Sequence, residues 1–342
     1  MAPPTTLPTR KLGKNGPSIP TIGFGLMGLS VAYGSVGSDE DRLKVLDRAW
    51  ELGYTNWDTA DMYGDSEDLV GKWFALHPDR RPDIFLASKF GITHTATGLV
   101  VNSSPAYCRQ QCEQSLKRLN TDYIDLYYMH RVDRVTPVEK TMEELVKLKE
   151  EGKIKHIGIS AASASTLRRA CAVHHVDAFQ VEYSPWALEI EGPDGHHLLD
   201  VCRELGVAVF AYSPLGRGIM TGQIRSPDDF EAGDLRRLFP RFSAENFPKN
   251  LVLVDKMKEL AAKKGCTSGQ LAMAWLMAQG DHIFPIPGTK KIKYLEENVG
   301  AVYVQVSKEE EKEIRQWIND IGFTGVRIPP GLLDEFNDSP PL

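Results

Sequence analysis

Four side chains capable of acid–base chemistry sit at the ends of three short apolar runs. They are Asp58, Tyr63, Lys89 and His130. A phenol has an unperturbed pKa of about 10, which makes it a poor proton donor near neutral pH, and a nearby cation lowers that pKa. We expect Lys89 to be the cation, Asp58 to keep Lys89 charged and oriented, and His130 to hydrogen-bond a substrate oxygen. Such a site would let Tyr63 protonate a carbonyl oxygen while a hydride is delivered.

The elements that must position these residues form a regular alternation. Eight apolar runs, each followed by an amphipathic pattern, cover residues 21–28, 54–60, 84–91, 123–132, 154–160, 178–184, 207–214 and 282–289. Strands that alternate with helices pair in parallel, and eight strands can close a barrel. We therefore predict an α/β fold of the (β/α)8 TIM-barrel class, with a wide doubly wound sheet as the alternative. In a TIM barrel the carboxyl ends of the strands meet at one rim, so the four side chains can converge there.

Three segments lie outside this alternation. Residues 10–20 contain a Lys-Asn-Gly turn and predict a hairpin that plugs the bottom of the barrel. The long connection 216–247 is typical of a functional loop. After a last helix at about 308–320, the Pro- and Gly-rich tail 321–342 is expected to fold over the active-site mouth. Residues 1–342 are thus expected to form one domain with a core at about 10–320.

A glycine motif at the first strand invites a different interpretation. Residues 23–28 match GxGxxG, the fingerprint of a dinucleotide-binding Rossmann fold. That fingerprint needs a helix directly behind the glycines. Here the helix begins only at Ser38, which forms a capping box with Asp41, and ends at Gly53. We reject the Rossmann interpretation and expect the glycines to let the backbone approach a ligand.

Composition limits the possible partners. With 40 Lys and Arg against 46 Asp and Glu, the net charge of −6 gives no support for nucleic-acid or membrane-surface binding. No apolar run approaches the roughly 20 residues needed to span a bilayer. The polar, Pro-rich start lacks a secretory signal. The five cysteines, an odd number without a CxxC motif, predict free thiols in a reducing cytoplasm.

The segment NWDTADMYGDSEDLVGKW resembles the hallmark segment of the aldo-keto reductase superfamily, and the resemblance extends over nearly the whole chain. It is most similar to the fungal and plant-type branch that includes pyridoxal reductases and auxin-induced-type proteins. The resemblance implies NADPH-dependent reduction of an aldehyde or ketone, with the tetrad Asp58, Tyr63, Lys89 and His130 and with Tyr63 as proton donor. We assign no metal ligands and leave the oligomeric state open.

The same resemblance implies a set of contacts to a nicotinamide cofactor that lies extended across the barrel mouth. The carboxamide would be held by Ser160 and Gln180, and the nicotinamide ring would stack on Tyr212. The pyrophosphate would be covered by Ser213, Leu215, Gly216 and Arg217. The 2′-phosphate would lie near Gly288, Thr289 and Lys290, and the adenine near Glu297 and Asn298.

Two positions depart from the family's pattern. Ala161 stands where the family often has Asn, and Tyr294 stands where many members have an Arg for the 2′-phosphate. Lys290, Lys291 and Lys293 can compensate, because a phosphate accepts any nearby cation. We therefore expect NADP(H) to be preferred over NAD(H).

Two alternatives stay open at this point. One is a cofactor-binding regulatory subunit with little turnover, similar to the potassium-channel β subunits of the same family. The other is a class I aldolase, in which Lys89 would form a Schiff base with the substrate. That chemistry needs an uncharged lysine, which an adjacent Asp58 would oppose.

Overall fold

A computed structural model describes residues 3, 5–32, 34–95, 98–329 and 336–342 of the chain. Eight parallel strands form one sheet in the order β12-β11-β10-β9-β8-β5-β4-β3. Their bounds are β3 Phe24–Gly25, β4 Asn56–Asp58, β5 Phe85–Phe90, β8 Ile124–Met129, β9 Ile154–Ser160, β10 Ala178–Glu182, β11 Ala208–Tyr212 and β12 Ile283–Pro285. Each falls inside one predicted apolar run, which confirms the eight parallel strands.

The sheet closes between its first and last strands. Gly25 and Gly288 form a parallel bridge, and the Gly23 amide donates to the Pro285 carbonyl at 2.8 Å. A Cβ atom on Gly25 would lie 2.8 Å from the carbonyl oxygen of Ile286. Gly25 therefore lets the strands β3 and β12 approach each other. Gly25 and Gly28 also line the cavity described below, so the expected approach of these glycines to a ligand stays a prediction.

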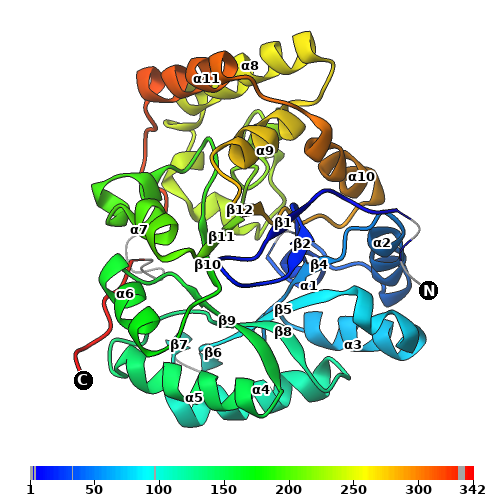
Figure 1. Cartoon of the computed structure of the whole chain (residues 1–342). Coiled ribbons are helices and arrows are strands. Elements are labelled where there is room, and N and C mark those ends of the chain that lie inside the picture. The colour runs from blue at the N-terminus through cyan, green and yellow to red at the C-terminus, as the bar shows by residue number, and fades with distance from the viewer. Residues whose placement is uncertain (1–2, 4, 33, 96–97, 330–335) are drawn as a thin grey trace.

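Helices surround the barrel on its outer side (Figure 1). They are α2 Asp39–Glu51, α3 Ser66–Leu76, α4 Pro105–Arg118, α5 Val138–Glu150, α6 Ala164–Val173, α7 Leu198–Leu205, α8 Phe247–Lys264, α9 Ser268–Ala278, α10 Ile292–Gly300 and α11 Lys308–Ile321. Among the described residues before α2, the one α-helical segment is the four-residue α1, Met27–Ser30. As predicted, Ser38 caps α2 by accepting from the Asp41 amide, and Gly53 has a positive φ of 71° just after it. No helix among the described residues is both long and apolar enough to cross a membrane.

The bottom of the barrel is closed by the predicted hairpin. The strands β1 Thr9–Lys11 and β2 Ser18–Pro20 pair antiparallel. Leu12 and Ile19 are buried in the apolar cluster that fills the barrel interior, together with Phe210 and Phe284. The hairpin therefore supplies the lowest layer of the interior core.

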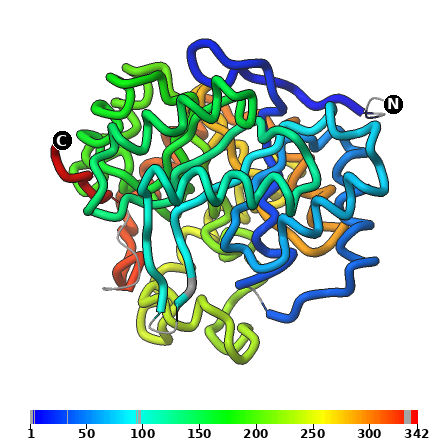
Figure 2. Tube along the Cα trace, turned by 90° about the horizontal axis from the view of Figure 1, so that it is seen from below, coloured from blue at the N-terminus to red at the C-terminus, as the bar shows by residue number. Residues whose placement is uncertain are grey.

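Two segments extend from the opposite side of the barrel (Figure 2). One is the insertion, residues 213–246, which contains only 3-10 turns: η4 Ile219–Thr221, η5 Pro227–Asp229, η6 Leu235–Leu238 and η7 Pro240–Phe242. The other is a hairpin of β6 Ile92–Thr95 and β7 Gly98–Val101, which the sequence analysis did not predict.

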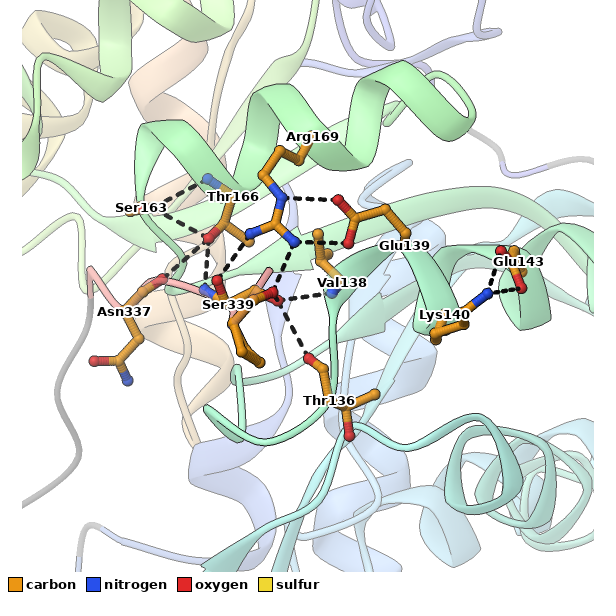
Figure 3. Close-up of polar contacts among 11 residues, drawn as sticks. Thr136, Val138, Glu139, Lys140, Glu143, Ser163, Thr166, Arg169, Asn337 and Ser339 are labelled. Carbon is orange, nitrogen blue, oxygen red and sulfur yellow. Dashed lines mark hydrogen bonds and ion pairs between the residues drawn. The ribbon is translucent and has the colours of Figure 1, made fainter. Parts of the chain in front are cut away.

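The segment 336–342 docks on the outside of the barrel, between the starts of α5 and α6 (Figure 3). The Ser339 hydroxyl accepts from the Val138 amide at 2.7 Å, and the Ser339 amide donates to Thr166 Oγ1 at 2.9 Å. Arg169 donates to the Ser339 carbonyl at 2.8 Å. Because α5 lacks a side-chain cap of its own, Ser339 supplies one from the far end of the chain.

Candidate active site

Lys89 lies at the centre of the predicted tetrad. Its Nζ donates to Asp58 Oδ1 at 2.6 Å, to the Thr59 carbonyl at 2.7 Å and to Tyr63 Oη at 3.5 Å. The side chain is fully buried at the end of β5, and Asp58 is 3% exposed at the end of β4. The second oxygen of Asp58 accepts from Gln180 Nε2 at 2.7 Å. The structure thus brings Asp58, Lys89 and Tyr63 into one hydrogen-bonded chain.

The lysine of the buried ion pair stays charged. Burial by itself would lower the pKa of Lys89, but the Asp58 carboxylate and the hydrogen bonds with Asp58 and Tyr63 outweigh it, so the pKa is raised. A charged Lys89 matches the predicted role of cation beside a phenol.

The structure corrects the predicted pKa of Tyr63. Lys89 does act to lower it, but burial of the phenol acts more strongly in the other direction and raises the pKa above 10. Desolvation penalises the phenolate, and one ammonium at 3.5 Å does not compensate for it. Tyr63 is therefore fully protonated at neutral pH, as a proton donor must be before the reaction.

His130 follows β8 and faces Tyr63. The two rings meet edge to face with their centroids 5.9 Å apart. Burial, together with the charges of Lys89 and Arg131, holds the pKa of His130 well below 6.5. The imidazole is therefore neutral across the physiological range and is suited to a hydrogen bond rather than an ion pair.

These residues open into a cavity of about 710 Å³. Asp58, Tyr63 and His130 line it, whereas Lys89 lies behind them. Most of the residues predicted to hold a cofactor also line it, namely Ser160, Gln180, Tyr212, Ser213, Leu215, Arg217, Gly288, Thr289 and Lys290. This volume lies within the ordinary range for small-molecule sites.

Three predicted cofactor residues do not line the cavity. Gly216 packs instead on Trp186, where a Cβ atom on the glycine would come within 3.0 Å of the indole. Asn298 is buried in α10, and the Glu297 carbonyl accepts from Gln270 Nε2 at 2.9 Å. The structure places these three beside the cavity wall rather than on it.

The donor set along this wall fits a dinucleotide. Because Gln180 donates its amide nitrogen to Asp58, its oxygen is left to accept from a carboxamide. Tyr212 packs on the barrel's interior cluster and presents a ring to the cavity. At the other end, Lys290 and Lys291 line the cavity and provide charge for a phosphate.

The two positions that depart from the family's pattern, Tyr294 and Ala161, lie in different surroundings. Tyr294 lines the cavity, and its hydroxyl donates to Gln223 Oε1 at 2.8 Å, which ties α10 to the insertion. Ala161 is buried with a positive φ of 51°. Lys290 donates to the Ser35 carbonyl at 2.7 Å, so the loop before α2 also contacts this end of the cavity.

Several cavity residues were missed from the sequence. Met62, Ile92, Arg131, Phe239 and Ile328 line it, and they come from five separate segments. Met62 and Arg131 follow strand ends, and this position was the one signal in the sequence that they could line the site. Ile92 lies in the unpredicted hairpin and Phe239 in the insertion, where the sequence carries no such signal. Ile328 shows that the segment after α11 reaches the cavity.

Asp61 is a further ionisable group beside the tetrad that was not predicted. Burial and the charge of Glu67 raise its pKa to about 8. Its Oδ1 has no hydrogen-bond partner among the described residues. Arg118 donates to the main-chain carbonyl of Asp61 at 3.0 Å and pairs with the buried carboxylate of Glu67 at 3.3 Å.

Comparison with known proteins assigns the family. A model of the Aldo/keto reductase family matches residues 21–319. The chain is 50% identical over 326 residues to the aldo-keto reductase str7 of Strobilurus tenacellus, which covers 94% of this chain and 95% of the relative. It is 49% identical over 342 residues to the aldo-keto reductase yakc of Schizosaccharomyces pombe, whose name specifies NADP(+). That match covers 98% of this chain and 99% of the relative. The protein belongs to the aldo/keto reductase family of oxidoreductases, which confirms the predicted resemblance.

Solved structures agree with the predicted fold. The glycerol dehydrogenase of Gluconobacter oxydans superposes with a TM-score of 0.80 at 26% identity, covering 95% of this chain and 98% of that one. An aldo/keto reductase from Klebsiella pneumoniae, in complex with NADP and acetate, superposes with a TM-score of 0.70 at 25% identity, covering 98% of this chain and 100% of that one. Both matches extend over the whole barrel, which confirms the (β/α)8 class.

Proposed function

We propose that the protein reduces an aldehyde or ketone to the alcohol with NADPH, with Tyr63 as the proton donor. The observation that carries this proposal is the position of Lys89 Nζ, 2.6 Å from the Asp58 carboxylate and 3.5 Å from the Tyr63 hydroxyl. A buried ion pair contributes little to stability, so its place beside a protonated phenol favours a catalytic role.

Each residue of the tetrad has one task in this mechanism. NADPH, when bound, supplies the hydride. The neutral His130 hydrogen-bonds the carbonyl oxygen and orients it toward Tyr63, which transfers its proton to that oxygen. Lys89 then stabilises the phenolate on Tyr63, and Asp58 holds Lys89 in place. Charge that develops at the oxygen thus meets donors that are already positioned.

The cofactor proposal rests on the wall of the cavity and on the relatives. Ser160, Gln180 and Tyr212 would hold the nicotinamide, and Arg217 would lie beside the pyrophosphate. Lys290 and Lys291 would receive the 2′-phosphate in place of the Arg that Tyr294 replaces. The names of yakc and of the K. pneumoniae complex both include NADP. We further propose that the enzyme acts in a reducing cytoplasm, for which its five free cysteines are suited.

The raised pKa of Lys89 argues against the aldolase alternative. A lysine that forms a Schiff base must lose its proton, and here Asp58 keeps the proton in place. The regulatory-subunit alternative shares the same cavity, so turnover must distinguish it from the enzyme.

The test is NADPH oxidation by purified protein over a panel of aldehydes and ketones, repeated with NADH. We expect turnover with carbonyls of apolar or aromatic bulk and a higher kcat/KM with NADPH. Tyr63→Phe should lose about 10²–10⁴-fold in kcat while NADPH binding stays within about twofold. Full activity in that variant would exclude the mechanism. NADPH binding without oxidation by any carbonyl would favour the regulatory subunit.

A further inference from the structure

A single buried carboxylate, Glu182, contacts two segments that cover different sides of the cavity. Glu182 ends β10 and is 2% exposed. It lies two residues beyond Gln180, and its neighbour across the sheet is Tyr212. Neither the tetrad nor the proposed cofactor contacts include Glu182, so its burial needs another explanation.

Two arginines from distant parts of the chain neutralise this carboxylate. Arg217, from the insertion, donates to Glu182 Oε2 at 2.8 Å, and Arg327, from the segment 322–328, donates to the same oxygen. Burial would raise the pKa of Glu182, but the two guanidinium groups outweigh it and lower the pKa, so Glu182 is ionised. A buried charge of this kind is stable only while its partners stay in place.

Each arginine organises a different wall of the cavity. Arg217 lines the cavity, its guanidinium lies 4.2 Å from the centre of the Phe239 ring, and its carbonyl accepts from Arg236 at 2.9 Å. Arg327 directly precedes Ile328, which also lines the cavity. Arg217 therefore holds the insertion at the cavity, whereas Arg327 holds the segment 322–328 there.

A second carboxylate reinforces the position of the segment 322–328. Glu189 pairs with Arg327 at 3.3 Å and with Arg241 at 2.9 Å. Arg241 in turn donates to the Gly325 carbonyl at 3.2 Å and lies 5.0 Å from the centre of the Phe323 ring. The segment 322–328 thus has an attachment of its own, besides Glu182.

We propose that Glu182 is a positioning residue that couples the cofactor side of the cavity to the substrate side. Both guanidinium groups contact the same oxygen, so the two cations also repel each other across it. A pyrophosphate beside Arg217 offsets the charge of that arginine, which weakens its repulsion of Arg327 and leaves Arg327 held more firmly by Glu182. Cofactor binding then holds the segment 322–328 more firmly at the substrate pocket. The cofactor and carbonyl assignments in this statement rest on the proposed function, whereas the attachment of both segments to Glu182 does not.

Hydrogen–deuterium exchange of the cofactor-free protein tests the attachment directly. Glu182→Gln should speed exchange about fivefold or more in both the insertion and the segment 322–328. Arg327→Gln should speed exchange in the segment 322–328 only. Arg217→Gln should speed exchange in the insertion and leave the segment 322–328 unchanged or slower. The matched control is Glu204→Gln, which removes the exposed ion pair with Arg168 and should change neither segment.

The variants have distinct outcomes. If the folded Glu182→Gln protein exchanges like the wild type in both segments, the proposal is overturned. It is also overturned if Arg217→Gln loosens the segment 322–328 as much as Arg327→Gln does. If Glu182→Gln does not fold, the comparison of Arg217→Gln with Arg327→Gln decides. The proposal then stands only if Arg327→Gln loosens the segment 322–328 and Arg217→Gln does not.

Ligand experiments then test the coupling. NADPH should slow exchange in the segment 322–328 of the wild type, and Arg217→Gln should remove that effect. Arg217→Gln should also raise the Kd for NADPH about tenfold, as expected for loss of a charged hydrogen bond. Arg327→Gln should raise the KM for the carbonyl and leave the Kd for NADPH unchanged. If the wild type reduces no carbonyl, the proposed function fails, but the cofactor-free exchange still decides the role of Glu182.

Discussion

The two ends of the barrel are built from different chemistry. At the bottom, Leu12 and Ile19 of the hairpin fill the barrel with apolar side chains, and Arg10 donates to main-chain carbonyls such as that of Gly280 at 2.8 Å. At the mouth, the charged pair Asp58 and Lys89 is buried beside a phenol. Apolar burial stabilises a fold, whereas a buried ion pair contributes little. The comparison suggests that the bottom supplies stability and the mouth supplies chemistry.

The largest expected effect is at the mouth. Lys89→Met should lower kcat/KM for carbonyl reduction by about 10²–10⁴-fold, because the phenolate formed on Tyr63 would have no counter-charge. Initial rates of NADPH oxidation measure this. The matched control lies at the bottom end: Lys155, at the start of β9, pairs with Asp125 at 3.0 Å, and Lys155→Met should leave kcat/KM unchanged. Equal losses in both lysine variants would contradict the division between the two ends.

The next effect belongs to the bottom. Leu12→Ala should lower the free energy of unfolding by about 2–4 kcal/mol, because it leaves a cavity in a fully buried cluster. Urea denaturation measures this, with Leu76→Ala, at a side chain 62% exposed, as the control. At temperatures where the variant is folded, kcat/KM should stay within about twofold of the wild type. A large loss of activity in folded Leu12→Ala would mean that the plug also shapes the mouth.

Some features of the fold and the site could be predicted from the sequence, and others could not. The alternation of apolar runs was sufficient for eight strands, and the position of Asp58, Lys89 and His130 at strand ends was sufficient to bring them together. The β6–β7 hairpin was missed because its strands have only four residues each, ITHT and GLVV, and the apolar stretch in the second strand is too short to indicate a strand. The pKa of Tyr63 was predicted with the wrong sign, because desolvation depends on the complete packing around the phenol.

Interactions between distant segments were also beyond sequence reasoning. Glu182 is the last residue of the apolar strand β10, and nothing near it in the sequence indicates its partners. Its partners Arg217 and Arg327 are 110 residues apart in the chain, and no local pattern relates them. The docking of Ser339 on α5 is of the same kind, because a cap supplied from the far end of the chain leaves α5 without a recognisable start signal.

A smaller effect at the mouth concerns pH. Asp61 has a pKa of about 8, whereas that of Tyr63 is above 10 and that of His130 is well below 6.5. Ionisation of Asp61 adds a negative charge near a phenol that must become a phenolate. We therefore expect kcat/KM for reduction to fall severalfold as the pH rises through about 8.

A pH–rate profile from pH 6.5 to 9.5 measures this effect, and Asp61→Asn should flatten the profile. Tyr63 stays protonated and His130 stays neutral over that range, so neither should contribute a step. A step near pH 8 that persists in Asp61→Asn would assign the titration to another group.

The smallest effect is a pH dependence at the bottom, where His282 directly precedes β12. Burial and the charges of Arg203 and Arg10 lower the pKa of His282 to about 4, against 6.5 in the unfolded chain. The unfolded state therefore binds a proton more readily, and the contribution of His282 to stability is present above pH 6.5 and lost as the pH falls toward 4. Because the ring is partly exposed, we expect a loss of only about 1 kcal/mol.

Urea denaturation at pH 7 and pH 5 should show a smaller loss of stability for His282→Asn than for the wild type. The control His197→Asn, at an exposed histidine, should behave like the wild type. An equal loss in His282→Asn and wild type would show that the titration of His282 does not contribute to the stability of the bottom.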